Sequence, residues 1–148
     1  MRHGHSPSPA EAGVKTDAQR PLSAKGRADA RRMAEEVLAR GGKPSLILHS
    51  PLLRAVQTAQ EAAAALGLKP EAFAALDNTL PPEEVLSQLR RRGADADAVL
   101  AVGHQPQIGE IAALLTADIY EIRPAGLVAV ELAAEPRFLW AANVDELG

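Results

Sequence analysis

The chain has 148 residues, of which 47% are hydrophobic and 24% are charged, a composition that suits one globular domain over residues 1–148. The formal net charge is -3 and the basic residues are spread along the chain, so no broad cationic surface for nucleic acid or anionic lipid is expected. The sequence has no cysteine, which excludes disulfides and thiol catalysis, and it has no apolar run near the ~20 residues of a membrane span. We expect a cytoplasmic protein that binds neither membranes nor nucleic acid.

The first third of the chain predicts a loop, a helix and a short strand. Residues 5–20 are rich in Ser, Pro, Ala and Gly and lack apolar periodicity, which predicts a long surface loop. Ser23 can cap a helix that Gly41 and Gly42 end. The apolar residues 46–48 then predict a short buried strand.

The rest of the chain alternates between predicted helices and strands. An Ala-rich helix over 54–66 is stopped by Gly67, and the apolar run 98–102 is the clearest buried strand. The other predicted elements are a strand over 72–76, a helix from Pro81 to Gly93, a helix after His104, and a hairpin of strands over 127–132 and 138–144. This order predicts an α/β fold, a three-layer α/β/α sandwich with a mostly parallel central sheet.

Four side chains carry the predicted chemistry: Arg2, His3, Arg54 and His104. Each falls at the end of a predicted strand or the start of the next helix, where such sheets bind ligands. A neutral His3 imidazole can attack phosphorus, Arg2 and Arg54 can bind the phosphoryl oxygens through paired hydrogen bonds, and His104 can donate another. The arginines supply the charge that a metal supplies elsewhere, so no metal or other cofactor is expected.

Four motifs resemble those of a known family: Arg2-His3-Gly4, Arg20-Pro-Leu-Ser-x-x-Gly, Ser50-Pro-x-x-Arg-Ala-x-x-Thr-Ala and Val102-Gly-His-x-Pro. They resemble the histidine phosphatase superfamily, and the short chain is similar to its SixA-type phosphohistidine phosphatases. The resemblance implies a phosphoglycerate mutase-like fold and a hydrolase with a phosphohistidine intermediate at His3. It also implies a place for Arg20 near the pocket mouth, although a surface ion pair is an equal alternative.

Three further polar residues have structural interpretations. Ser50 can end a strand, and Thr58 can brace Arg54 one helical turn away. His49 is interpreted as a core or edge residue with a satisfied hydrogen bond.

The chain departs from the family pattern at its start. His5 stands where many members have Glu, Asp or Gln, and it is either a loop residue or a titrating group near the pocket. Only Met1 precedes Arg2, whereas the family has a hydrophobic strand there. We therefore expect the first strand to be missing or truncated, so that His3 lacks a platform and neighbouring strands expose unpaired edges, unless a neighbouring chain fills the gap.

The general acid that an alkoxide leaving group needs is the second open question. Asp77 is the nearest candidate, with a turn as the alternative interpretation, and His5 is the other. SixA-type enzymes lack this acid, which fits a phosphoramidate substrate because protonated imidazole leaves easily. The first hypothesis is a phosphohistidine phosphatase that acts on a phosphorelay or phosphotransfer protein. The alternatives are a small-molecule phosphomonoesterase and a non-catalytic phosphate-binding module; oligomeric state is open.

Overall fold

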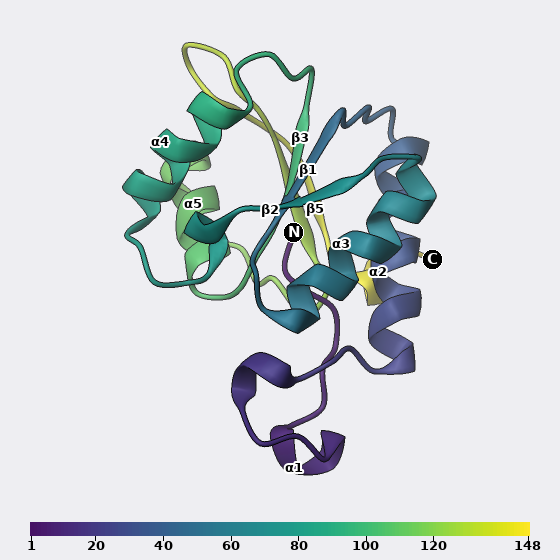
Figure 1. Cartoon of the computed structure of the whole chain (residues 1–148). Coiled ribbons are helices and arrows are strands. Elements are labelled where there is room, and N and C mark those ends of the chain that lie inside the picture. The colour runs from purple at the N-terminus through teal and green to yellow at the C-terminus, as the bar shows by residue number, and fades with distance from the viewer.

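Five strands form the middle layer of the computed structural model, which describes residues 1–148 (Figure 1). They are β1 (Leu46–His49), β2 (Pro70–Ala72), β3 (Val99–Val102), β4 (Leu127–Glu131) and β5 (Arg137–Ala142). The first three are parallel in the order β2-β1-β3, and β4 and β5 form an antiparallel hairpin. The predicted hairpin is therefore confirmed.

Four helices cover the two faces of this layer. They are α2 (Ala24–Ala39), α3 (Leu53–Leu66), α4 (Pro82–Arg92) and α5 (Gln107–Thr116). Figure 1 shows α2 and α3 on one side of the strands and α4 and α5 on the other, and each pair packs over its own cluster of buried apolar residues. This arrangement is the predicted three-layer α/β/α fold. No helix combines the length and apolar character that a membrane crossing requires.

The helix boundaries follow the signals in the sequence. The Ser23 hydroxyl accepts a hydrogen bond from the Gly26 N–H at 3.0 Å and so caps α2. Gly67 ends α3 in the left-handed conformation, with φ of 69°, where a side chain would be strained. Pro82 occupies the first position of α4, where its missing N–H costs nothing.

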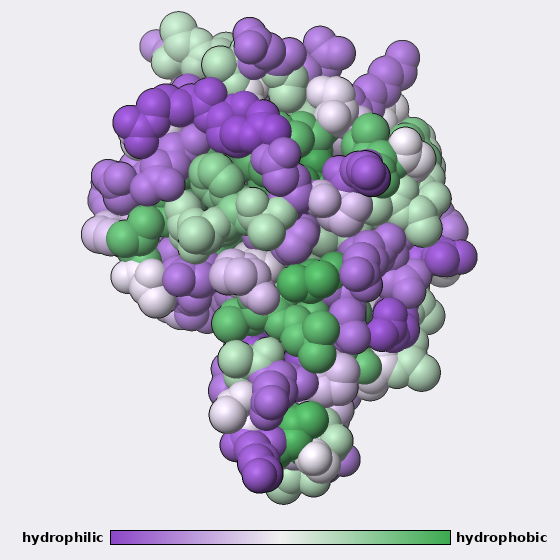
Figure 2. Space-filling view, viewed as in Figure 1, coloured by the Kyte–Doolittle hydropathy of each residue, from purple (hydrophilic) through white to green (hydrophobic).

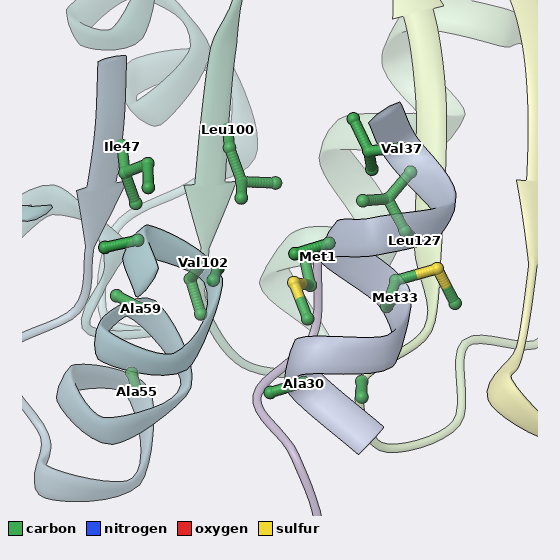
Figure 3. Close-up of a cluster of buried hydrophobic side chains, with 14 of the residues drawn as sticks. Met1, Ala30, Met33, Val37, Ile47, Ala55, Ala59, Leu100, Val102 and Leu127 are labelled. Atoms are coloured by element: carbon green, nitrogen blue, oxygen red, sulfur yellow. The ribbon is translucent and has the colours of Figure 1, made fainter. Parts of the chain in front are cut away.

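Residues 1–3 lie between the parallel sheet and the hairpin. On the side of the parallel sheet, the Gly103 N–H donates to the Met1 carbonyl and the Gly103 carbonyl accepts from the His3 N–H, both at 3.0 Å. On the side of the hairpin, the Arg2 N–H donates to the Gly126 carbonyl at 2.9 Å, and the Ala125 N–H donates to the His3 carbonyl at 3.0 Å. The Met1 side chain is buried in the core beside Val102 and Met33 of α2 (Figure 3).

The structure thus corrects the expectation that His3 lacks a platform. Only one bridge, Arg2 with Gly103, stands in place of a full strand. The main chain of residues 1–3 nevertheless pairs with both neighbours at the level of the candidate nucleophile.

Two element predictions are wrong. Residues 72–76 do not form a strand, because β2 ends at Ala72 and Ala74–Leu76 is a turn of 3-10 helix that buries Leu76. The predicted loop over 5–20 contains α1 (Pro9–Ala12) and the 3-10 turn η1 (Asp17–Gln19). The sequence signal for α1 was present, since Ser8 and Glu11 form a capping box. This segment makes the lobe that projects below the body in Figures 1 and 2.

Candidate active site

His3 presents one free ring nitrogen in a buried position. Its Nδ1 lies 2.8 Å from the Gly4 carbonyl oxygen, and because a carbonyl only accepts hydrogen bonds, Nδ1 must carry the proton. The lone pair of the neutral ring is therefore on Nε2. Burial is the main cause that lowers the pKa of His3 to about 3, so the imidazole is neutral at physiological pH. A neutral ring held in this tautomer can act as a nucleophile.

His104 lies beside His3, with 5.2 Å between the ring centroids. Its Nε2 is 2.6 Å from the Ser50 hydroxyl oxygen, which also accepts the Leu52 N–H. A hydroxyl that accepts from Leu52 can donate its own hydrogen to Nε2, which leaves the His104 proton on Nδ1. Burial, followed by the charge of Arg54, lowers the pKa of His104 to about 4. The ring can therefore offer a neutral N–H at Nδ1.

Arg54 and Arg2 complete the site from two different elements. Arg54 stands in the first turn of α3 and is 8% exposed. Arg2 lies in the segment between the sheets, and its Nη1 donates to the Ile122 carbonyl at 3.0 Å. Both side chains therefore reach the site with part of the guanidinium group already held by protein oxygens.

Three buried N–H donors of this site have no hydrogen-bond partner: Arg2 Nε, Arg54 Nε and His104 Nδ1. They are three of the four unpartnered buried side-chain polar atoms in the chain; the fourth is Gln107 Oε1. An unsatisfied buried donor costs about 1–3 kcal/mol, so three together beside His3 make this a place where an anionic ligand can supply the acceptors. A tetrahedral oxyanion has the charge and the oxygen atoms to do so.

Thr58 connects the His3 segment to Arg54. Its hydroxyl accepts the Gly4 N–H at 3.0 Å and donates to the Arg54 carbonyl at 2.7 Å, and the residue is fully buried. The predicted role as a brace for Arg54 is confirmed, and the contact to Gly4 extends it.

The secondary candidates lie outside the cluster of unpartnered donors. His5 is exposed and hydrogen-bonds Ser23 at 2.8 Å. Asp77 is half-buried and accepts the Thr79 N–H at 3.1 Å in a turn. No hydrogen bond joins either residue to His3 or His104. Arg20 directs its guanidinium into the 5–20 segment rather than toward His3.

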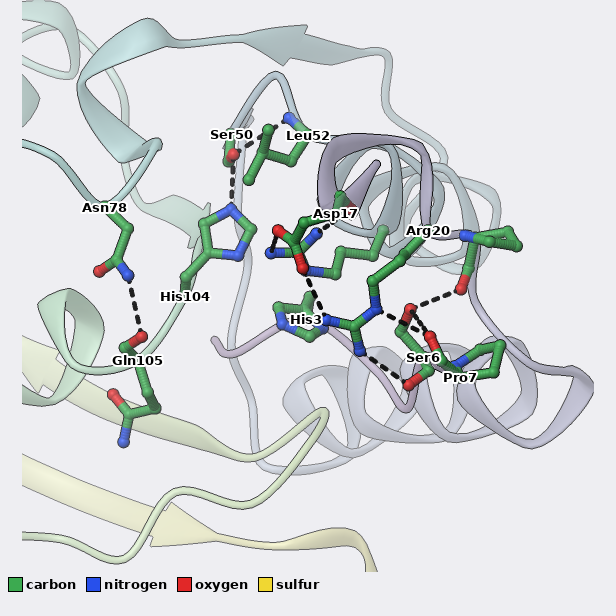
Figure 4. A network of polar contacts seen from close by, with 12 residues as sticks. His3, Ser6, Pro7, Asp17, Arg20, Ser50, Leu52, Asn78, His104 and Gln105 are labelled. Atoms are coloured by element: carbon green, nitrogen blue, oxygen red, sulfur yellow. Dashed lines mark hydrogen bonds and ion pairs between the residues drawn. The ribbon is translucent and has the colours of Figure 1, made fainter. Parts of the chain in front are cut away.

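Sequence reasoning missed two residues that touch the site. Ser50 was interpreted as a strand end, yet its hydroxyl holds His104. Asp17 was not singled out, yet its carboxylate is 3.0 Å from the Arg54 Nη2 (Figure 4). Spacing could have paired Asp17 with Arg20, three residues on, but it gives no sign of the contact with Arg54. His49 matches its structural interpretation, since it is buried and its Nδ1 bonds the Ser50 carbonyl.

No group of three or more His, Asp or Glu side chains comes together in a way that could hold a metal ion. The charges of Arg54 and Arg2 act on His3, and those of Asp17 and Asp77 act on the neighbouring His104.

Residues 1–79, which include His3 and Arg54, match the family model for the histidine phosphatase superfamily, branch 1. The chain belongs to this superfamily. The chain is similar in sequence to an uncharacterized protein of Picosynechococcus sp. The two are 36% identical over 140 residues, which cover 90% of this chain and 84% of the relative.

Solved structures of histidine phosphatases share the fold over almost their whole length. The protein histidine phosphatase SixA complexed with tungstate matches with a TM-score of 0.89 and 25% identity, covering 100% of this chain and 97% of SixA. A proposed phosphohistidine phosphatase SixA of Agrobacterium tumefaciens matches with a TM-score of 0.81 at 23% identity, over 96% of this chain and 94% of the other.

A more distant likeness, in fold alone, is to the phosphoserine phosphatase of Entamoeba histolytica. Its TM-score is 0.72 at 13% identity, with coverage of 99% and 96%. The superfamily membership and the SixA-like structure together support phosphatase activity.

Proposed function

We propose that this histidine phosphatase removes phosphoryl groups from phosphohistidine on a partner protein, with His3 as the nucleophile. The observation that carries the proposal is the set of unpartnered buried donors, Arg2 Nε, Arg54 Nε and His104 Nδ1, on residues that neighbour His3, whose own Nε2 is free. The likeness to a SixA structure that holds tungstate, a tetrahedral oxyanion, supports the same interpretation.

Binding places the three phosphoryl oxygens on these donors. The guanidinium groups of Arg2 and Arg54 neutralise the dianion, and His104 Nδ1 adds a further hydrogen bond. Their positions are fixed before substrate arrives, because Ser50 holds His104 and Thr58 holds the Arg54 turn against Gly4. Donors that need no reorganisation stabilise the charge that shifts during transfer.

Transfer then proceeds in two displacements on phosphorus. The His3 Nε2 lone pair forms a P–N bond while the P–N bond to the substrate imidazole breaks, and that imidazole leaves as a neutral ring because it entered protonated. The proton stays on His3 Nδ1, which donates it to the Gly4 carbonyl, and this hydrogen bond stabilises the cationic ring formed on phosphorylation. Water attacks phospho-His3 in the second step, restores the neutral ring and releases inorganic phosphate.

The groups beside the site support one kind of leaving group over another. No carboxylate hydrogen-bonds His3 or His104, and Asp17 is paired with Arg54 and Arg20. An alkoxide leaving group needs a proton from such an acid, whereas a protonated imidazole brings its own. This difference supports phosphohistidine over a phosphate ester.

The decisive experiment offers a phosphohistidine-bearing protein and para-nitrophenyl phosphate side by side to wild type and to His3→Ala. We expect loss of label from the protein that depends on His3, little ester cleavage, and an acid-labile phosphoryl group trapped on His3 in wild type. His49→Gln serves as a matched control, because His49 is also buried and bonds a main-chain carbonyl next to it. Label loss that survives in His3→Ala would refute the assignment.

A phosphomonoesterase is the second candidate function, and one observation favours it. Asp77 lies close enough to His104 for its negative charge to oppose, in part, the lowering of the pKa of that ring. If Asp77 is the acid, Asp77→Asn lowers cleavage of alkyl phosphates about 100-fold and leaves phosphohistidine turnover unchanged. Phosphate binding with no turnover of either substrate would instead show a non-catalytic phosphate-binding module.

A further inference from the structure

The Arg54 guanidinium already carries an anion in this structure. Its Nη2 lies 3.0 Å from the Asp17 Oδ2, and its Nη1 donates to the Asp17 main-chain carbonyl at 2.9 Å. The two partners differ in depth, because the Arg54 side chain is 9% exposed and the Asp17 side chain is 61% exposed. The carboxylate therefore lies at the outer end of the arginine, at the mouth of the site.

Arg20 fixes this carboxylate in place. Its Nη1 lies 3.0 Å from the Asp17 Oδ1, while its Nε and Nη2 donate to the carbonyls of Pro7 and Ser6 at 2.7 and 3.0 Å. Figure 4 shows Asp17 between Arg20 and the His3–His104 pair. Asp17 thus bridges an arginine of the site and an arginine that holds the 5–20 segment together, which distinguishes it from a freely moving surface charge.

The bridge keeps an ionised carboxylate at the mouth. Hydrogen bonding from Arg20, with a further contribution from Arg54, holds the pKa of Asp17 below its usual value, so the group stays ionised and is a poor proton donor. The unpartnered donors are buried, so a bound phosphoryl group occupies the inner part of the site. The remainder of the substrate must then extend outward, past Asp17.

We propose that Asp17 is a specificity-determining residue, whose fixed carboxylate favours phosphoryl groups carried on cationic or neutral groups and disfavours those carried on carboxylate-bearing molecules. This inference rests on the proposed function, because protonated phosphohistidine presents a positive ring at the position that Asp17 faces. Phosphorylated small acids, which present a carboxylate there, are repelled. A unit charge acting over about 7 Å changes binding about threefold at the dielectric constant of water and about fiftyfold at the value of about 20 that is typical near a protein surface.

Binding of three small ligands tests this inference without requiring turnover. Calorimetry on the full chain would compare phosphoethanolamine, which carries a cation, with phosphoglycolate, which carries a carboxylate, and with inorganic phosphate. We expect wild type to prefer phosphoethanolamine and Asp17→Asn to reduce that preference about tenfold or more. Asp17→Glu should retain most of the preference, because it keeps the charge. Glu71→Gln removes another exposed carboxylate paired with an arginine, Arg92, and should leave the preference unchanged.

The outcomes separate three cases. If Asp17→Asn changes the affinity for all three ligands equally, Asp17 only positions Arg54. If it changes none of the affinities, the charge of Asp17 does not act on the bound ligand. Either result overturns the inference. Arg54→Gln tests the proposed function itself. If that variant binds inorganic phosphate as tightly as wild type, the anion site is wrong, whatever Asp17 does.

Discussion

Gly26→Ala isolates the contact between α2 and the segment that carries the nucleophile. Gly26 is the third residue of α2, where alanine is normally favoured over glycine by about 0.5–1 kcal/mol. Here a Cβ would stand 2.2 Å from the His5 carbonyl oxygen and 2.9 Å from its nitrogen. Both atoms are main chain, so the helix and the segment must separate by about 1 Å to reach ordinary contact. Such overpacking costs about 1–3 kcal/mol or more and outweighs the helical gain.

The separation should also displace His3, which lies two residues from His5. We expect Gly26→Ala to lower the free energy of unfolding by about 2 kcal/mol, measured by urea titration, and to lower kcat about 100-fold, because a shift of about 1 Å misaligns the reacting atoms. Gly109→Ala is the matched control. It is the third residue of α5, and its Cβ would meet only the flexible end of Gln105 at 2.9 Å. The reasoning is refuted if Gly26→Ala is as stable and active as Gly109→Ala.

Three further predictions concern the buried polar groups. The folded-state pKa values of His3 and His104 are about 3 and about 4, below the unfolded value of about 6.5. Their contribution to stability is therefore complete above pH 6.5 and is lost as the pH falls toward 4 and 3. Urea unfolding should show the free energy of unfolding fall by about 2 kcal/mol per histidine between pH 7 and 5, and His104→Gln should lose about 2 kcal/mol less than wild type over the same range. Thr58→Val should lower the free energy of unfolding by about 1–3 kcal/mol, because the Gly4 N–H loses its acceptor. Thr58→Ser keeps the hydroxyl and should retain most of that stability in the same urea titration. Equal losses in the two variants would contradict the hydrogen-bond explanation. Ser50→Ala should lower kcat about tenfold by releasing His104, and steady-state kinetics with an unchanged kcat would show that the hydroxyl does not orient the ring.

The parts of the fold that sequence reasoning predicted are those with local signals. Ser23, Gly67 and Pro82 mark helix ends through their own capping chemistry, so the helices begin and end within a few residues of the predicted positions. The strand expected over 72–76 was wrong because pairing with β1 ends after three residues. That limit is set by the partner strand and leaves no mark in the local composition.

The site was predictable in its residue types and less so in its support. His3 and Arg54 lie within sequence motifs, and the structure brings them together with Arg2 and His104. The three unpartnered donors belong to Arg2, Arg54 and His104. Asp17 approaches Arg54 across 37 residues of sequence, and no local pattern reports such a contact. The platform under His3 was misjudged for the same reason, because its partners are main-chain groups at Gly103 and Ala125, whose side chains reveal nothing of that role.

The position of residues 1–3 has a consequence for how the protein folds. The hydrogen bond from the Met1 amine to Ala101 spans 100 residues, and those to Gly103, Ala125 and Gly126 are comparably long in sequence. Contacts of this separation carry a large loop-closure cost and form late. The parallel strands and the C-terminal hairpin must therefore dock before the nucleophile has a fixed place. During refolding we expect helical signal to return first and tungstate binding last, so that catalytic competence marks the final step of chain assembly.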